Sequence, residues 1–204
     1  MKILVTGATG FVGKTLLPLL VEKGHEIIVL TRDIKSAQVR LPVVCKIIEW
    51  DPAKTLTHIE DDIDIVINLC GENVAGGRWT SKRKQAIYNS RIIATRNLID
   101  YFRKNPHPIK TWISASAIGI YENSIVLDES ATNGQGFLAK TCKDWEEETF
   151  KARDLNIRTI AFRIGIVLGF DGGAMEKMLP LFKLGLGGKI SSGNQWMSWI
   201  HVRD

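Results

Sequence analysis

Three glycines recur at every third position directly after a short apolar run at the start of the chain. The sequence opens M-K-I-L-V-T-G-A-T-G-F-V-G, which places Gly7, Gly10 and Gly13 behind that run. Where such a run forms a strand and a helix follows, the glycines allow a tight bend, close approach of a pyrophosphate and close helix packing. The first amides of the helix then attract the phosphates. The pattern therefore predicts a dinucleotide site rather than a generic strand–turn–helix junction without a ligand.

Apolar runs and helical patterns alternate along the rest of the 204 residues. The expected helices are residues 11–23, 81–103 with Ser81 as N-cap, 136–153 and 174–184. The expected strands are residues 2–6, 25–31, 43–50, 62–69, 109–116, 157–164 and 196–202. Strands that alternate with helices form parallel units in one open sheet. We therefore predict an α/β fold of the Rossmann type, a doubly wound parallel sheet with helices on both faces. One domain would cover 1–204, with a substrate-binding region beginning near 170–204.

Composition and charge argue against several classes of protein. The net charge of +5 is scattered apart from a basic cluster at 82–84, so we expect an anionic small ligand and no nucleic-acid partner. The three cysteines stand far apart, at positions 45, 70 and 142, which suggests neither disulfides nor a zinc site. No apolar run approaches the ~20 residues of a membrane span, and the first residues do not resemble a signal peptide. We expect a cytoplasmic protein with no membrane partner and no metal.

The end of the second predicted strand bears on which nucleotide would bind. The strand ends V-L-T-R-D, so Thr31 and Arg32 occupy the place where an acidic residue would hydrogen-bond the adenosine ribose, with Asp33 one step beyond. A guanidinium matches a phosphate in planar, bidentate geometry. The sequence therefore favours NADP(H), with Arg32 on the 2′-phosphate, over NAD(H). The alternative for Arg32 is a solvated residue at a strand end.

Several strings of the sequence, taken together, resemble a known family. T-G-A-T-G-F-V-G resembles the fingerprint of extended short-chain dehydrogenases/reductases, the NAD(P)-dependent sugar epimerases and dehydratases. Longer strings resemble one atypical branch, the epimerase-like proteins related to bacterial YfcH. These are N-L-C-G-E-N-V-A-G-G-R-W (68–79), N-S-R-I-I-A-T-R (89–96), S-A-S-A-I-G-I-Y (114–121), R-I-G-I-V-L-G (163–169) and G-N-Q-W-M-S-W-I-H-V-R-D (193–204). The resemblance covers essentially the whole chain. It stops where such proteins continue into a C-terminal region that completes the substrate pocket, so we expect that region to be lacking.

The resemblance implies a set of residues that contact the cofactor. In the turn and after the second strand they are Gly7, Thr9, Gly10, Phe11, Val12, Gly13, Thr31 and Arg32. At the end of the fourth strand they are Asn68, Leu69, Cys70 and Gly71, followed by Arg91 on the long helix. Gly165 and Ile166 would lie by the nicotinamide through their backbone. The alternatives are a strand-end cap for Asn68, a surface position for Arg91, and packing for the last two.

The catalytic machinery that the resemblance implies is incomplete. Ser116 occupies the place of the catalytic serine, with Ser114 a weaker candidate, but no Y-x-x-x-K pair follows. Phe137 and Leu138 stand where the tyrosine is expected, and phenylalanine has no proton to exchange. Tyr121 is the remaining candidate for the proton donor, with packing as its alternative. Lys140 and Lys143 have the wrong spacing and are expected to be solvated, and Glu72 is expected to be a structural carboxylate.

The late segment Q-W-M-S-W bears on the substrate. Relatives that bind nucleotide diphosphate sugars often carry an arginine where Met197 stands here, and methionine cannot bind an anion. The tryptophan-rich strand indicates either a more apolar substrate or core packing, and core packing is favoured.

Three functions follow from these features. The first is an NADP(H)-dependent oxidoreductase or epimerase-like enzyme that acts on an unidentified small molecule. The second is a non-catalytic NADP(H)-binding sensor or partner-binding module, because the tyrosine–lysine pair is absent. The third, nucleic-acid binding, depends on the basic cluster alone. By fold analogy, a homodimer could form through the helices at 81–103 and 136–153.

Overall fold

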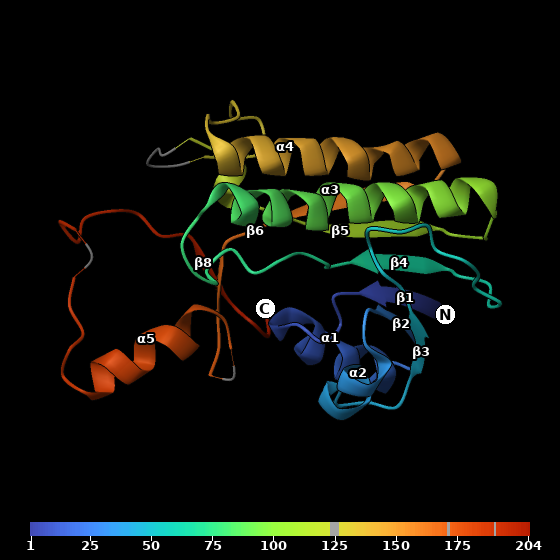
Figure 1. Cartoon of the computed structure of the whole chain (residues 1–204), viewed down its shortest axis with the longest axis horizontal. Helices are drawn as coiled ribbons and strands as arrows, with labels where there is room; N and C mark the ends of the chain where they lie inside the picture. The colour runs from blue at the N-terminus through green and yellow to red at the C-terminus, as the bar shows by residue number, and fades with distance from the viewer. Residues whose placement is uncertain (123–126, 171, 190) are drawn as a thin grey trace.

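One parallel sheet forms the centre of the molecule. The computed structural model describes residues 1–122, 127–170, 172–189 and 191–204. The six strands of the sheet are β1 (Lys2–Thr6), β2 (Glu26–Thr31), β3 (Lys46–Glu49), β4 (Ile65–Asn68), β5 (Thr111–Ala117) and β6 (Arg158–Ile164). Their order is β3-β2-β1-β4-β5-β6, and every pairing is parallel (Figure 1). This is the strand order of a dinucleotide-binding Rossmann fold, with the order reversing between β1 and β4.

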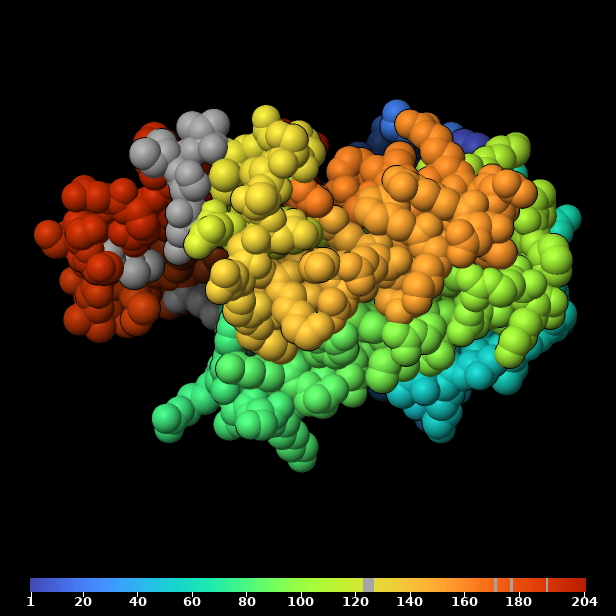
Figure 2. All heavy atoms as spheres, turned by 90° about the horizontal axis from the view of Figure 1, so that it is seen from above, coloured from blue at the N-terminus to red at the C-terminus, as the bar shows by residue number. Residues whose placement is uncertain are grey.

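Helices cover both faces of the sheet. The helices α1 (Phe11–Glu22) and α2 (Ile34–Arg40) lie on one face, and α3 (Ser81–Lys104) and α4 (Phe137–Phe150) lie on the other (Figure 1). Seen from above, α3 and α4 run side by side across the molecule (Figure 2). The predicted α/β fold with a doubly wound sheet is therefore confirmed.

Successive side chains of β1 pack alternately into two hydrophobic cores, one on each face of the sheet. Leu4 packs with the α3 side, whereas Ile3 and Val5 pack with Leu17 of α1 on the opposite side. Such alternation is what a strand buried between two helical layers requires.

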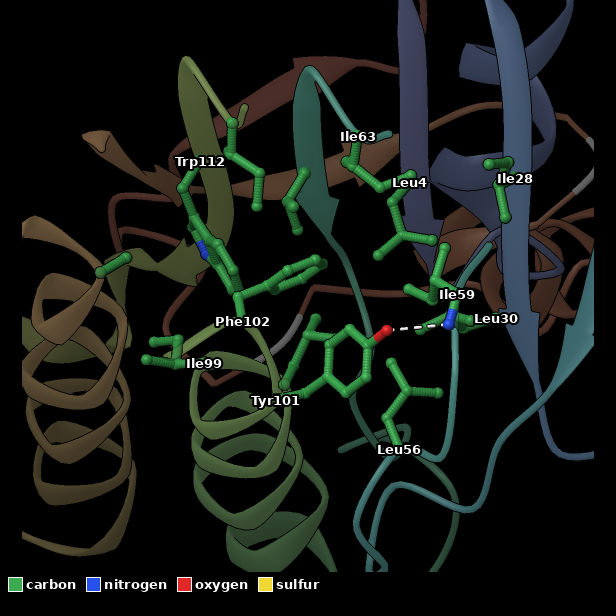
Figure 3. Packing of buried hydrophobic residues seen from close by; sticks show 14 of the residues in the cluster. Leu4, Ile28, Leu30, Leu56, Ile59, Ile63, Ile99, Tyr101, Phe102 and Trp112 are labelled. Carbon is green, nitrogen blue, oxygen red and sulfur yellow. Dashed lines mark hydrogen bonds between the residues drawn. The ribbon is translucent and has the colours of Figure 1, made fainter. Parts of the chain in front are cut away.

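The core on the α3 side is covered in part by irregular chain. Residues 50–64 run from β3 to β4 without a helix, yet the tryptophan, leucine and isoleucine side chains of this segment are buried. The Tyr101 hydroxyl accepts a 2.8 Å hydrogen bond from the Ile59 amide, as Figure 3 shows. A polar contact thus fastens this irregular segment to α3 inside an otherwise apolar cluster.

Some boundaries differ from the sequence prediction. The short helix α2 was not predicted, because its only buried side chain is Ala37 and it lacks an apolar stripe. The cap of α3 is Thr80, whose hydroxyl accepts from the Arg83 amide, so the prediction of Ser81 was wrong by one residue. Beyond α4 the chain tightens into the 3₁₀ turn η2 (Lys151–Leu155) before β6.

The last forty residues form a smaller unit beside the sheet. Strand β7 (Ile166–Leu168) pairs in parallel with β8 (Trp199–His201), and α5 (Gly173–Lys183) lies between them in sequence. Helix α5 lies at one end of the molecule, and the C-terminus returns towards α1 (Figure 1). Figure 2 shows most of this unit at the same end. Trp196 is 75% exposed and Met197 is 48% exposed, so the preference for core packing of this segment was wrong.

One aromatic ring of α1 packs against this unit. A Cβ atom on Gly169, Gly172 or Gly173 would lie within 3.0 Å of the Phe11 ring. The glycine-rich stretch after β7 therefore leaves room for Phe11, which begins α1 directly behind the first glycine turn.

Candidate cofactor site

A cleft opens at the carboxyl edge of the sheet, where the strand order reverses. It encloses about 360 Å³. Its walls are the residues at 6–10, 30–32, 50–53 and 69–72, together with Asn89, Ser90 and Ile93 of α3. Ligands of open α/β sheets bind at such an edge. The segment 50–53, which follows β3, was missed by the sequence reasoning, although its place after a predicted strand was the available signal.

The glycine turn has the geometry of a cradle for phosphate. Gly7 has a φ of +69°, and a Cβ there would lie 2.5 Å from the carbonyl oxygen of Leu69. A Cβ on Gly13 would lie 2.6 Å from the carbonyl oxygen of Ala8, so this glycine lets α1 pack on the turn. Gly10 is the N-cap of α1 and provides no side chain to cap the first amides. A helix start without a side-chain cap, next to a glycine turn that lines the cleft, suits a pyrophosphate.

Charged side chains after β2 complement this cradle. Arg32 is exposed at the cleft and forms no hydrogen bond or ion pair with any described residue. The carboxylate of Asp33 accepts a 2.9 Å hydrogen bond from the Ser36 amide and so caps α2. Arg40 of α2, which the sequence reasoning missed, donates a 3.0 Å hydrogen bond to the carbonyl of Thr9. Two guanidinium groups therefore lie beside the turn, while the nearby carboxylate is engaged in capping a helix.

Asn68 lies beneath the cleft and not in its wall. Its side chain is fully buried, accepts a 2.7 Å hydrogen bond from the Thr6 hydroxyl and donates a 2.9 Å bond to the Thr95 hydroxyl. The Thr6 hydroxyl in turn accepts from the Cys70 amide at 3.3 Å. Asn68 therefore fixes the floor, whereas Leu69, Cys70 and Gly71 form the wall itself. Burial raises the pKa of the Cys70 thiol, so this cysteine stays protonated at neutral pH.

Arg91 approaches the same wall from α3. Its guanidinium lies over the Trp145 ring at 5.2 Å and donates to the carbonyl of Glu72 at 3.1 Å. A Cβ on Gly71 would lie 3.0 Å from this guanidinium. Burial lowers the pKa of Arg91, although the group remains charged at neutral pH. Arg91 thus holds the segment after β4 in place and brings a positive charge next to Gly71.

A buried network surrounds the predicted catalytic serine. The Ser116 hydroxyl donates a 2.6 Å hydrogen bond to Oε1 of Glu146 on α4. Arg163 of β6 donates to both oxygens of that carboxylate at 2.8 Å, through Nε and Nη2. The Tyr121 hydroxyl accepts a further 2.8 Å bond from Arg163 Nη1. The structure thus joins Ser116 and Tyr121 through two charged residues that the sequence reasoning missed.

The charges in this network balance. Burial alone would raise the pKa of Glu146, but hydrogen bonds from Arg163 and Ser116 hold it below its ordinary range. The carboxylate raises the pKa of Arg163 above its usual value. Both groups therefore stay ionised, and neither contributes an unpaired charge to the interior. A glutamate on the apolar stripe of a helix and an arginine within an apolar strand were signals that could have marked the pair.

The position expected for a catalytic tyrosine holds apolar side chains. Phe137 packs edge-on against Trp79, with ring centres 5.7 Å apart, and Leu138 approaches Gly119. The two lysines of α4 are exposed and pair with carboxylates on the same helix, Lys140 at 2.6 Å and Lys143 at 3.9 Å. No described residue of α4 takes the place of the tyrosine.

Glu72 and the residues after β6 have structural partners. The Glu72 carboxylate pairs with Arg83 at 2.7 Å. The Ile166 amide donates a 2.9 Å bond to the carbonyl of Ser198, and a Cβ on Gly165 would lie 2.7 Å from that oxygen. Gly165 and Ile166 therefore pair with a neighbouring segment and do not line the cleft.

The described residues form neither a metal site nor a membrane-spanning helix. Nowhere do three or more His, Cys, Asp or Glu side chains gather closely enough to hold a metal ion. None of the described helices has both the length and the hydropathy that a membrane span requires.

Similar proteins share both the sequence and the fold. The model of the "NAD dependent epimerase/dehydratase family" matches residues 3–204. The chain is 38% identical to the epimerase family protein YfhF of Bacillus subtilis, covering 100% of this chain and 67% of that protein. It is 37% identical to the chloroplastic SDR39U1 homolog of Arabidopsis thaliana, covering 100% of this chain and 60% of that protein.

Solved structures share the fold of this chain. The crystal structure of human epimerase family protein SDR39U1 (isoform 2) with NADPH superposes with a TM-score of 0.82 at 34% identity, covering 99% of this chain and 66% of the human protein. A UDP-glucuronic acid 4-epimerase from Bacillus cereus, at 19% identity and a TM-score of 0.81, shares the fold. The chain spans between 60% and 67% of the length of these first relatives. The family match extends over nearly all of its residues, and the chain therefore belongs to the NAD dependent epimerase/dehydratase family.

Proposed function

We propose that the chain binds NADP(H) in the cleft and acts as an NADP(H)-dependent oxidoreductase or epimerase-like enzyme. One observation carries this proposal: the side-chain-free glycine cradle and the Arg32 guanidinium lie in the same cleft. The Asp33 carboxylate, which could have bound a ribose hydroxyl, instead caps α2. The NADPH in the structure of the human relative supports the choice of cofactor.

Each part of the cleft has a role in this proposal. The first amides of α1 hold the pyrophosphate, and Arg32 and Arg40 attract the 2′-phosphate of the adenosine ribose. The backbone after β4 lies where the riboses would pass, fixed from below by Asn68 and from the side by Arg91. When bound, the cofactor supplies or accepts a hydride.

The proton of the reaction is assigned to the Tyr121 hydroxyl. This phenol lines a second cavity and accepts a hydrogen bond from Arg163, which leaves its own proton available to a substrate oxygen. Ser116 remains the predicted orienting residue. To meet a substrate, its hydroxyl would have to turn away from Glu146.

A non-catalytic NADP(H)-binding sensor or partner-binding module is the second candidate. Two observations favour it. The Ser116 hydroxyl is 3% exposed and already bonded to Glu146, and α4 carries Phe137 and Leu138 in place of a tyrosine. Such a protein would bind the cofactor as tightly but would have no turnover.

Oxidation of NADPH in the presence of a panel of ketones and aldehydes distinguishes the two. For the enzyme we expect turnover with at least one compound. Tyr121→Phe should then lower kcat by about 100-fold, the effect of removing one proton-transfer group, without changing NADPH affinity. Tyr88→Phe, which removes a hydroxyl bonded to Asp144 on the outer face of α3 and α4, is the control. Tight NADPH binding without turnover establishes the second candidate, and absence of NADPH binding in calorimetry refutes both.

A further inference from the structure

A second cavity lies at the carboxyl end of β5. It encloses about 740 Å³ between the turn after that strand and the segment that contains Trp196. Ile118, Gly119 and Tyr121 line one side, and Leu138 at the start of α4 lines another. The sequence reasoning did not identify this cavity, because the segment 196–198 meets walls that lie about sixty or more residues earlier in the chain.

Two pairings place this cavity beside the cofactor cleft. Strand β5 is the direct neighbour of β4, with Ser114 in register with Asn68, so both openings lie on the carboxyl edge of the sheet. Ser198, a wall residue of the cavity, accepts a hydrogen bond from the Ile166 amide. The wall is therefore attached to Ile166, which does not line the cleft itself but which the family resemblance implies lies by the nicotinamide. A substrate here would sit on the reactive side of a bound dinucleotide.

The described lining combines apolar side chains with a few polar ones and contains no cation. Its large apolar side chains are those of Ile118, Leu127, Leu138, Trp196 and Met197. Among the described lining residues none is lysine, arginine or histidine, and the single ionisable acid is Glu122. The guanidinium of Arg163, which bonds the wall residue Tyr121, also bonds both oxygens of Glu146, so its charge is already compensated.

The exposed side chains of this wall indicate which ligands suit it. Trp196 presents a large aromatic face, since 75% of its surface is exposed. Burying an aromatic face against an apolar ligand is favourable, whereas a diphosphate would lose its hydration and gain no cation in return. The Glu122 carboxylate in the lining would repel such an anion further.

From these observations we propose that this cavity takes an uncharged, largely apolar carbonyl or hydroxyl compound and excludes nucleotide diphosphate sugars. Trp196 and Met197 would cover the apolar body, and the reacting oxygen would point to Tyr121. The inference builds on the proposed function, because it assigns the substrate class of that same site.

The test uses the whole chain saturated with NADPH and two probes, 1-tetralone and UDP-glucose. Ligand-detected NMR titration should show that 1-tetralone binds more tightly than UDP-glucose by about tenfold or more. Trp196→Ala should weaken 1-tetralone binding by about tenfold, the scale of one lost aromatic contact. Trp199→Ala is the matched control, because Trp199 is equally prominent at 63% exposed but does not line the cavity.

A gain-of-charge variant sharpens the result. Met197→Arg should weaken the binding of 1-tetralone and strengthen the binding of UDP-glucose. The inference is overturned if UDP-glucose binds the parent chain as tightly as 1-tetralone, if 1-tetralone fails to bind at millimolar concentration, or if Trp196→Ala leaves its affinity unchanged. Calorimetry with NADPH on the same samples distinguishes a failure of the proposed substrate class from a failure of the proposed function. Normal NADPH binding with a failed ketone result discards only the substrate class, whereas loss of NADPH binding discards the proposed function.

Discussion

The Ser116 hydroxyl and the Glu146 carboxylate are joined by a 2.6 Å hydrogen bond in the interior between β5 and α4. Since Arg163 binds the same carboxylate through two nitrogens, a hydroxyl, a carboxylate and a guanidinium are held in one fixed arrangement. Such fully satisfied polar networks fix the packing of a core, and removing one member leaves its partners unpaired.

The first prediction concerns the acid stability of this network. Because the folded state holds the pKa of Glu146 below its ordinary value of 4.5, its contribution is present above about pH 4.5 and is lost as the pH falls through the folded value. Glu146→Gln should lower the free energy of unfolding by about 2 kcal/mol at pH 7 and flatten its fall in acid. Urea unfolding at a series of pH values between 3 and 7 on the pH scale measures both.

The neighbouring acid provides the control for this experiment. Glu147 is 62% exposed at its side chain and meets Lys143 only at 3.9 Å. Glu147→Gln should change the free energy of unfolding by about 0.5 kcal/mol or less. Equal losses in the two variants would show that the buried network adds nothing specific.

The second prediction concerns the choice between nicotinamide nucleotides. Arg32→Ala should weaken the binding of NADPH by about 10- to 100-fold, which is the range expected for the loss of one charge-assisted hydrogen bond. The affinity for NADH should stay nearly unchanged. Calorimetry with both nucleotides measures this difference. Arg158→Ala, at the opposite end of the strands, removes an equally charged exposed side chain and should affect neither. If the parent chain binds NADH as tightly as NADPH, the role of Arg32 is wrong.

The third prediction separates backbone strain from steric collision in the turn. Gly7 and Gly24 have similar φ values, +69° and +75°. Of these two, a Cβ on Gly7 would collide with backbone atoms, whereas a Cβ on Gly24 would have no atom within 4 Å. Gly24→Ala should cost about 1 kcal/mol for the left-handed conformation alone. Gly7→Ala should cost about 2 kcal/mol more and abolish NADPH binding. Thermal unfolding with and without NADPH gives both quantities, and similar behaviour of the two variants would contradict the collision.

The fourth prediction concerns the contact between α1 and the glycines after β7. Phe11→Ala removes the ring that fills the space left by Gly169, Gly172 and Gly173. Amides of β7 should then exchange with solvent about tenfold faster, because their local opening becomes easier. Phe170→Ala, 84% exposed in the same stretch, should leave exchange as it is. Unchanged protection in Phe11→Ala would mean that the ring does not stabilise this unit.

Local signals made much of the fold predictable. The glycine spacing, the buried strands and the long helix each carry their pattern within a few residues, so their positions agree with the structure to within a few residues. The exceptions had weak local signals. Helix α2 lacks an apolar stripe, and the tryptophans near 196 lie in a segment whose burial depends on what packs against it.

The sequence predicted the site residues only where they belong to a short sequence motif. The residues of the turn and of the β4 end are recognised by their order in the sequence, and the structure places most of them around one cleft. The Glu146–Arg163 pair, the contact of Arg40 with Thr9 and the second cavity join elements that lie far apart in the chain. Such long-range pairings follow from the topology and have no signature in a short string of residues.

The cap on α2 bears on how this protein could be re-engineered. To make the cleft prefer a nucleotide without the extra phosphate, a carboxylate would be needed after β2. The available carboxylate there, that of Asp33, already accepts a hydrogen bond from the Ser36 amide. Deleting the neighbouring arginine would supply no new acceptor. Redirecting Asp33 would remove the cap of α2, whose Arg40 bonds the carbonyl of Thr9 in the glycine turn. A reversal of the proposed nucleotide preference therefore calls for a redesigned loop and not a single substitution.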